Sequence, residues 1–514
     1  MSTPLPQHVR IAIAGTGFSG LAAAVRLLED GERDLVLLER SGDVGGTWRD
    51  NSYPGCACDV PSHLYSLSFA PNPSWSRAFS PQQEIHRYLQ GVARDHGVLP
   101  YVRFDADMRH AAWDDEQQRW TIETSRGTLT ADILISGVGG LSEPAIPALP
   151  GLDSFAGATF HSATWDHEHE LRGARVAVIG TGASAIQFVP EIVKDVEHLT
   201  LLQRTPPWVL PRRDRAIKPW EQRLFRLFPP AQKAVRAAIY AARELFALPM
   251  LHPKLAQRTQ GMALVHIHRS ISDPELRAKL TPDYTIGCKR ILLSNRYYPA
   301  LARENVDVVT TGIREILPHA VVTDDGVEHP CDTIIFGTGF QVTDMPVGHR
   351  VVGRAGRTLH EEWNGSPSAH LGTTVAGFPN LFMLLGPNTG LGHTSITVMI
   401  EAQIDYVRKA IRHLNATGAT SLEPRTQAQS AWDAEIDERG EGTVWTAGGC
   451  ASWYLDDTGR NSTLWPTFTF TYRRRVAHFQ PQEYTFSLRP PARTTAGGTT
   501  DEPTGSAERA TVVA

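Results

Sequence analysis

The chain has 514 residues, of which 41% are hydrophobic and 20% charged, and its formal net charge is −5. This length predicts two or three domains, and this charge gives no reason to expect a nucleic acid or an anionic membrane as a partner. No apolar run approaches the ~20 residues that a membrane-spanning helix requires, and the first ten residues lack the apolar region of a signal peptide. The five cysteines are odd in number and scattered, which predicts reduced thiols in a cytoplasmic protein, not a disulfide framework.

The first nucleotide-binding motif lies between Val9 and Glu39, where a buried strand, a glycine-rich turn, a helix and a second strand follow one another. This βαβ order predicts a parallel sheet. Gly15, Gly17 and Gly20 permit a tight turn and a close approach of the backbone to a pyrophosphate at the N-terminus of the helix. Glu39 ends the second strand, where its carboxylate can accept hydrogen bonds from an adenosine ribose.

The second motif repeats this order over residues 175–205. Its loop and its second strand end supply Gly180, Thr181, Gly182, Ser184, Arg204 and Thr205. A carboxylate would repel the 2′-phosphate of NADPH, whereas the Arg204 guanidinium can bind it through charge-assisted hydrogen bonds. The alternative for Arg204 is a surface ion pair. The first motif therefore predicts an FAD site and the second an NADPH site.

The order of these motifs predicts an α/β fold with two Rossmann-like dinucleotide-binding domains. The FAD-binding domain is predicted to be discontinuous, comprising 1–150 and 377–490, and the NADPH-binding domain to comprise 151–376. Apolar residues at helical spacing with interspersed Arg and Lys predict a helical insertion at about 213–286, which packs in a core or cleft or lies on a membrane surface. The tail 491–514 is rich in Thr, Gly, Ala and Pro and is predicted to be disordered.

Two longer motifs resemble the flavin-dependent Baeyer–Villiger monooxygenases, which are relatives of the flavin-containing monooxygenases. FAGATFHSATWD at 155–166 fits the fingerprint F-x-G-x-x-x-H-x-x-x-W-P/D, and GGTWRDNSYPGCACD at 45–59 fits the pattern G-G-x-W…Y-P-G-x-x-x-D. With both nucleotide loops, the resemblance extends from Val9 to about Tyr484. It implies an enzyme that uses FAD, NADPH and O₂ to convert a small ketone to an ester or lactone through a flavin C4a-peroxide.

The resemblance also implies residue roles. In the segment Gly287-Cys288-Lys289-Arg290, Arg290 is the implied catalytic arginine and Lys289 the implied contact of the 2′-phosphate. Asp59 is implied to orient Arg290, and His161 and Trp165 to couple domain movement to catalysis. The remaining implied cofactor contacts are Gly46, Thr47, Trp48, Asp59, Tyr65 and Gln187, although a plain core tryptophan would look identical to Trp48 in sequence.

Several alternatives remain open. The main one is an N- or S-oxygenating flavin monooxygenase, and the others are an NADPH–flavin reductase and a non-catalytic flavoprotein. Gln341 and the stretch 461–475 depart from the pattern of well-known relatives, so no substrate preference is transferred. Cys56 and Cys58 lack the spacing of a flavin redox dithiol and are interpreted as packing residues. The sequence predicts no metal site and a monomer or weak oligomer.

Overall fold

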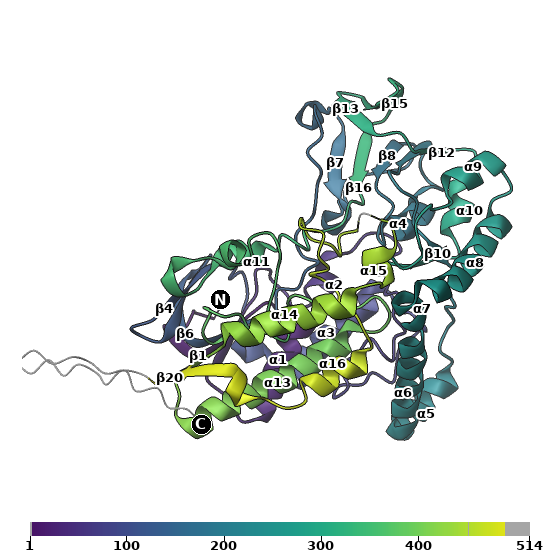
Figure 1. Ribbon diagram of the computed structural model, residues 1–514. Helices are drawn as coiled ribbons and strands as arrows, with labels where there is room; N and C mark the ends of the chain where they lie inside the picture. Colours follow the sequence, from purple (N-terminus) through teal and green to yellow (C-terminus); the bar gives the residue numbers. More distant parts are fainter. Residues whose placement is uncertain (1–2, 451, 489–514) are drawn as a thin grey trace, which may run out of the picture.

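The computed structural model describes residues 3–450 and 452–488, so the tail 491–514 lies outside the described residues. Two sheet-containing domains lie side by side, with the mixed sheet of β1 and β6 in one and the parallel sheet of β8 and β16 in the other (Figure 1). The prediction of two Rossmann-like domains is confirmed. Within the described residues, no helix is long and apolar enough to cross a membrane.

The first sheet has the order β17-β4-β5-β6-β1-β2-β3, and β18 also pairs with β6. Its strands are β1 (His8–Ala14), β2 (Leu35–Leu38), β3 (Val102–Arg103), β4 (Met108–Asp114), β5 (Arg119–Thr124), β6 (Gly127–Ser136), β17 (Val351–Val352) and β18 (Leu381–Met383). Helices α1 (Phe18–Glu29), α3 (Gln82–Asp95) and α13 (Ile396–Thr417) pack together beside it, and the short α2 (Thr47–Asp50) contacts α3. The parallel pairing of β1 with β2 and β6 places the first glycine loop at the carboxyl edge of the sheet, where nucleotides bind in this fold.

The second sheet has the order β12-β9-β8-β16-β7 and is parallel throughout. Its strands are β7 (Ala158–His161), β8 (Arg175–Ile179), β9 (His198–Leu202), β12 (Val306–Val309) and β16 (Thr333–Phe336), and α4 (Ala185–Ile192) and α10 (Tyr297–Leu301) pack against each other beside it. A three-stranded antiparallel sheet of β13 (Ile313–Leu317), β14 (Ala320–Thr323) and β15 (Glu328–Pro330) precedes β16. The second glycine loop follows β8 and therefore lies at the carboxyl edge of the second sheet, as the first loop does in the first sheet.

Helices interrupt the second domain where the sequence predicts an insertion. They are α5 (Pro219–Leu227), α6 (Pro229–Leu245), α7 (Leu248–Leu251), α8 (Pro253–Ser270) and α9 (Pro274–Lys279). The strands that flank them, β10 (Val209–Leu210) and β11 (Leu292–Leu293), pair in parallel, so the insertion leaves and returns at one place. Residue 290 therefore lies directly at the exit of the insertion.

The chain rejoins the first domain after β16. Helices α11 (Pro346–Arg350) and α12 (Leu359–Trp363) flank β17, which pairs with β4 of the first sheet. The chain is thus part of the first sheet from Val351, ahead of the predicted boundary at 377. The C-terminal part adds α14 (Thr426–Gly440), α15 (Val444–Ala447), α16 (Thr469–Arg475) and the antiparallel pair β19 (Ser421–Pro424) and β20 (Tyr484–Ser487).

Candidate active site

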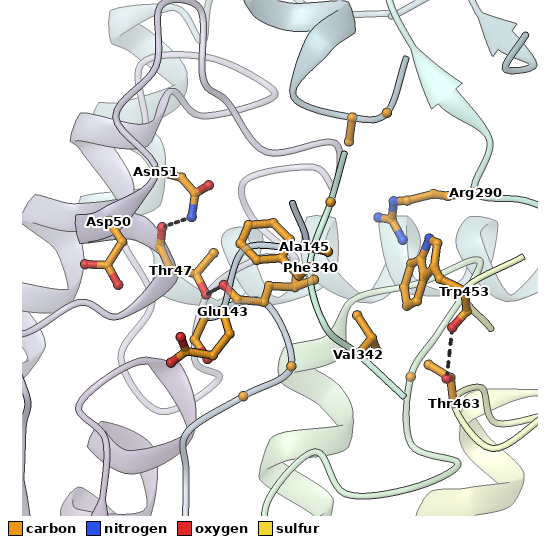
Figure 2. Close-up of a pocket in the computed structure, with 18 of the residues that line it drawn as sticks. Thr47, Asp50, Asn51, Glu143, Ala145, Arg290, Phe340, Val342, Trp453 and Thr463 are labelled. Carbon is orange, nitrogen blue, oxygen red and sulfur yellow. Dashed lines mark hydrogen bonds between the residues drawn. The ribbon is translucent and has the colours of Figure 1, made fainter. Parts of the chain in front are cut away.

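A cavity of about 1190 Å³ lies between the two domains and takes its walls from both. Figure 2 shows part of it, including the Arg290 guanidinium and the Trp453 ring. Phe340 and Val342, which Figure 2 also labels, belong to the interdomain linker, the segment 337–345 between β16 and α11. Most of the predicted site residues line it: Gly15, Gly17, Glu39, Gly46, Thr47, Trp48, Asp59, Tyr65, Gly180, Thr181, Gly182, Gln187, Arg204, Thr205, Lys289 and Arg290. The fold thus brings residues from widely separated sequence segments, between Gly15 and Arg290, to one space.

The first glycine loop has no room for a side chain at Gly15 or Gly20. Gly15 has a φ of +93°, and a Cβ there would lie 2.8 Å from the carbonyl oxygen of Gly137. A Cβ on Gly20 would lie 1.9 Å from the carbonyl oxygen of Gly15, so α1 starts in direct contact with the turn. Gly17 faces Gly46, whose own Cβ would lie 3.1 Å from the Gly17 Cα. Bare backbone at the helix N-terminus is what a close pyrophosphate requires, so these residues fit FAD.

Glu39 lies at the end of the first motif with only 3% of its surface exposed. Its carboxylate accepts hydrogen bonds from the backbone N–H of Thr16 at 3.1 Å and of Ser41 at 2.9 Å, and forms an ion pair with Arg49 at 2.8 Å. These contacts hold an ionised acceptor at the cavity wall, where an adenosine ribose is expected.

Trp48 and Tyr65 form one unit at the cavity wall. The indole Nε1 of Trp48 donates a hydrogen bond to the Tyr65 hydroxyl at 2.9 Å, and the two rings meet edge to face with centroids 5.5 Å apart. Trp48 is partly buried and contacts the cores of both domains. It is therefore a packing residue that also borders the cavity, and its contact with a cofactor stays a prediction.

The second glycine loop repeats the tight geometry of the first. Gly180 has a φ of +105°, and a Cβ there would lie 2.5 Å from the carbonyl oxygen of Gly337. Gly182 and Thr181 line the cavity, whereas Ser184 is the residue before α4 and does not. The Thr181 hydroxyl donates to the carbonyl oxygen of Thr205 at 3.3 Å, which ties the loop to the end of β9.

Two cations border the second loop. Arg204 is exposed at the end of β9 and has no ion pair among the described residues. The Lys289 ammonium lies 5.1 Å from the centroid of the Tyr284 ring. Burial and then the positive charge of Arg204 lower the pKa of Lys289, so the two cations lie close together. Asp283 offsets part of the charge at Lys289, and Arg204 has no ion pair among the described residues, so this place fits a 2′-phosphate better than a surface ion pair.

Replacing Arg204 by Ala is expected to raise the KM for NADPH by at least about tenfold, because a charge-assisted hydrogen bond contributes about 1.5–3 kcal/mol. The KM for NADH is expected to change little, since NADH carries no 2′-phosphate. Steady-state kinetics with both nucleotides measure this, with the exposed Arg172→Ala variant as control. Equal effects on the two nucleotides would remove the assignment.

Arg290 and Asp59 form a two-point ion pair. Nε and one terminal nitrogen of the guanidinium donate to the two carboxylate oxygens at 2.8 Å each. The side chains are 31% and 26% exposed, and both residues line the cavity. Burial raises the pKa of Asp59, but the Arg290 charge and its hydrogen bonds outweigh this and hold the pKa of that carboxyl below its usual value. The Asp59 charge raises the pKa of Arg290, so the guanidinium is a permanent cation with remaining N–H donors.

Three further residues lie around this pair, and the sequence analysis did not single out the two arginines among them. Arg243 of α6 donates to the backbone carbonyl of Asp59 at 2.9 Å, and Arg212 donates to that of Cys58 at 3.0 Å. Tyr454 is 1% exposed, and burial raises its pKa to about 12, although the Arg290 charge opposes this rise. Arg243 follows the pattern of an ordinary solvated helix face, so no sequence signal marks it as a contact of the active site.

The fingerprint residues lie outside the cavity wall. His161 ends β7 and is 1% exposed, and its ring meets Phe340 of the interdomain linker edge to face with centroids 5.7 Å apart. Trp165 packs against Phe188 of α4, with ring centroids 5.3 Å apart. Gln187 of α4 exchanges two hydrogen bonds with the backbone of Ala57, at 2.8 and 3.2 Å. These contacts join the second domain to the linker and to the segment that carries Asp59, as a coupling role requires.

Residues 8–235 match the family model described as flavin-binding monooxygenase-like. The chain is 55% identical over 480 residues to a Baeyer–Villiger monooxygenase of Streptomyces coelicolor, covering 93% of this chain and 92% of that one. It is 49% identical over 498 residues to a Baeyer–Villiger monooxygenase of Pseudomonas aeruginosa, covering 95% and 94%. The chain belongs to the Baeyer–Villiger monooxygenase family. A crystal structure of the cyclohexanone monooxygenase from Rhodococcus sp. Phi1 bound to NADP⁺ has a TM-score of 0.85 at 28% identity, covering 94% of this chain and 100% of that one.

This family member contains a disulfide beside the active site. Cys288 and Cys450 are bonded, with Cα atoms 6.2 Å apart and a sequence separation of 162. The prediction that all five cysteines are reduced is therefore wrong, because neither count nor spacing reveals a pairing that only the tertiary fold creates. Cys56, Cys58 and Cys331 are free and buried, and burial raises the pKa of Cys56 to about 12, so these thiols are unreactive.

The disulfide ties the Arg290 segment to the segment that carries Trp453. We expect its reduction to lower the melting temperature of the wild-type protein by a few degrees, because a cross-link over a long loop contributes about 2–4 kcal/mol. Thermal unfolding with and without a phosphine reductant measures this. Cys331→Ser should respond to the reductant as the wild type does, whereas Cys450→Ser should melt lower and show no further response. A wild-type melting temperature that does not change with the reductant would contradict a stabilising Cys288–Cys450 disulfide.

Proposed function

We propose that this protein is an FAD-dependent Baeyer–Villiger monooxygenase that uses NADPH and O₂ to convert a small ketone to an ester or lactone. The observation that supports this best is the Arg290–Asp59 ion pair at the wall of the cavity that both glycine loops border. The family relationship supports the same reaction.

The two glycine loops and their strand ends fit two dinucleotides. The loop at Gly15 and the acceptor Glu39 would hold FAD, and the loop at Gly180 with Arg204 and Lys289 would hold NADPH. Bound FAD supplies the redox chemistry by accepting a hydride from NADPH and activating O₂. The protein contributes binding, orientation and charge.

Arg290 provides the charge that this reaction needs. When an oxygen nucleophile adds to a ketone carbonyl, the carbonyl oxygen gains negative charge, and a fixed cation with free N–H donors stabilises it. Arg290 keeps its proton at every working pH and presents its donors in one plane. Asp59 engages two of its nitrogens, which orients the guanidinium plane, and the N–H donors that Asp59 does not use remain for other partners.

The ketone would lie between Arg290 and the linker. Trp453, Phe340 and Val342 line this part of the cavity. Trp453 is 44% exposed, which is unusual for a tryptophan and leaves its face open to a bound apolar molecule. The substrate class that fits is therefore an apolar ketone whose carbonyl oxygen points at Arg290.

Purified FAD-loaded protein tests the proposal when NADPH oxidation and products are followed with a panel of ketones and sulfides. The proposed function expects ketone-dependent NADPH oxidation with an ester or lactone as product. Sulfoxides without any ester would identify an S-oxygenating enzyme, and NADPH oxidation without an oxygenated product would identify a reductase. The monomeric or weakly oligomeric state and the cytoplasmic location stay predictions.

A further inference from the structure

Three side chains with metal-binding atoms converge on the surface of the first domain. Asp344 lies in the linker that follows β16, His349 lies on α11 and His360 lies on α12. Their ligand atoms all lie within 4.8 Å of one another. The two imidazole rings stack with centroids 3.9 Å apart, and the nearest nitrogen of each lies close to the same oxygen of Asp344. No step of the proposed reaction uses this cluster.

The spacing is close to that of a tetrahedral metal site. Zn²⁺ binds imidazole nitrogen and carboxylate oxygen at about 2.0–2.2 Å, which places neighbouring ligand atoms about 3.3–3.6 Å apart. His360 Nδ1 lies 3.4 Å from Asp344 Oδ1, within that range, and His349 Nε2 lies 2.7 Å from the same oxygen. A small rotation of the exposed His349 ring would lengthen the distance from His349 Nε2 to Asp344 Oδ1. Two imidazoles and one carboxylate select Zn²⁺ and similar transition metals over Mg²⁺ and Ca²⁺, which prefer oxygen ligands.

The scaffold beneath the cluster is rigid. Leu359 and Trp363 of α12 are buried, and a Cβ on Gly348 of α11 would lie 3.0 Å from the Trp363 ring, so the two helices are in close contact. The start of α12 is fixed by a reciprocal pair of hydrogen bonds between Thr358 and Glu361, at 2.7 and 3.1 Å. Both histidines therefore project from helices with fixed backbones, and only Asp344 belongs to a loop.

We propose that Asp344, His349 and His360 form a binding site for a divalent transition metal of the Zn²⁺ class, which fastens the interdomain linker to the first domain. The linker runs from β16 of the second sheet to α11, and Phe340, Val342 and Met345 of this linker line the cofactor cavity. Asp344 lies between Val342 and Met345 in sequence, so a bound metal joins the linker to α11 and α12. The site regulates the mobility of the cavity wall without touching a cofactor.

Calorimetric titration of the tag-free, FAD-loaded full chain with Zn²⁺ tests the site. We expect one ion to bind per chain, with at least tenfold weaker binding in each of Asp344→Asn, His349→Ala and His360→Ala. His268→Ala, which removes an exposed histidine outside the cluster, should bind as the wild type does. Absence of Zn²⁺ binding to the wild type, or equal binding by all variants, would overturn the proposal.

Hydrogen exchange of the backbone amides tests the effect on the linker. Zn²⁺ is expected to slow exchange at residues 337–350 of the wild type and to leave it unchanged in His360→Ala. Binding without slower exchange in this segment would overturn the linker part of the proposal. Neither measurement requires turnover, so both are independent of the ketone reaction.

Discussion

The Arg290→Ala variant is expected to bind FAD and to be reduced by NADPH, while its rate of ester formation falls by about 10²–10³. The reduction step needs the two nucleotides side by side, and their glycine loops do not depend on Arg290. The oxygen-transfer step needs a cation at the ketone oxygen, and among the described residues Arg290 is the arginine that both lines the cavity and pairs with Asp59. Stopped-flow measurement of flavin reduction, combined with product analysis, separates the two steps.

Arg290→Lys provides the matched control. Lysine keeps the positive charge but cannot make the two-point contact with Asp59, so an intermediate rate is expected. Flavin reduction should be similar in the wild type and both variants. Ester formation at the wild-type rate in Arg290→Ala would exclude Arg290 from the oxygen-transfer step.

The Asp59→Asn variant is expected to lose both stability and ester formation. Removal of this carboxylate leaves Arg290 and Arg243 close together without a counter-charge. Breaking a buried ion pair costs about 3–5 kcal/mol, and the partial exposure of this pair reduces the expected loss to about 1–3 kcal/mol. Because the fold lowers the pKa of Asp59, its contribution is complete above the unfolded value of about 3.9 and is lost as the pH falls through the lowered value. The difference in stability between wild type and variant should therefore be constant between about pH 6 and 8 and should shrink only in acid.

Thermal and urea unfolding measure this gap, with Asp437→Asn as the control. Asp437 makes an exposed ion pair with Arg460 at 2.7 Å, and such pairs contribute only about 0–1 kcal/mol. The effects of Asp59→Asn and Arg290→Ala on ester formation should not add in the double variant, because the two residues act as one unit. Additive effects, or an Asp59→Asn variant as stable as the wild type, would contradict this reading of the pair.

The nucleotide sites were predictable because their signals are local in sequence. In each motif a strand, a glycine turn, a helix and the end of a second strand follow within about 30 residues, and backbone geometry requires those glycines. The Arg290–Asp59 contact is different, since 231 residues separate its partners and only the family resemblance suggested it. No periodicity in either segment indicates the pairing.

The features that the sequence did not predict depend on tertiary contacts. The disulfide and the arginines around Asp59 depend on how the helical insertion folds back against the first domain. Strand β17 has only two residues, too few for any hydrophobic pattern. The sequence therefore could not predict that the chain rejoins the first sheet at Val351. The cluster of Asp344, His349 and His360 forms only because α11 packs against α12.

Product analysis under ¹⁸O₂ is the most direct test of the central claim, that this cavity inserts one atom of molecular oxygen beside a ketone carbonyl. With FAD-loaded protein, NADPH and a ketone that supports turnover, mass spectrometry is expected to find one ¹⁸O atom per ester molecule, and none when the label is supplied as water. An unlabelled ester, or consumption of NADPH and O₂ without any oxygenated product from the whole ketone panel, would contradict it.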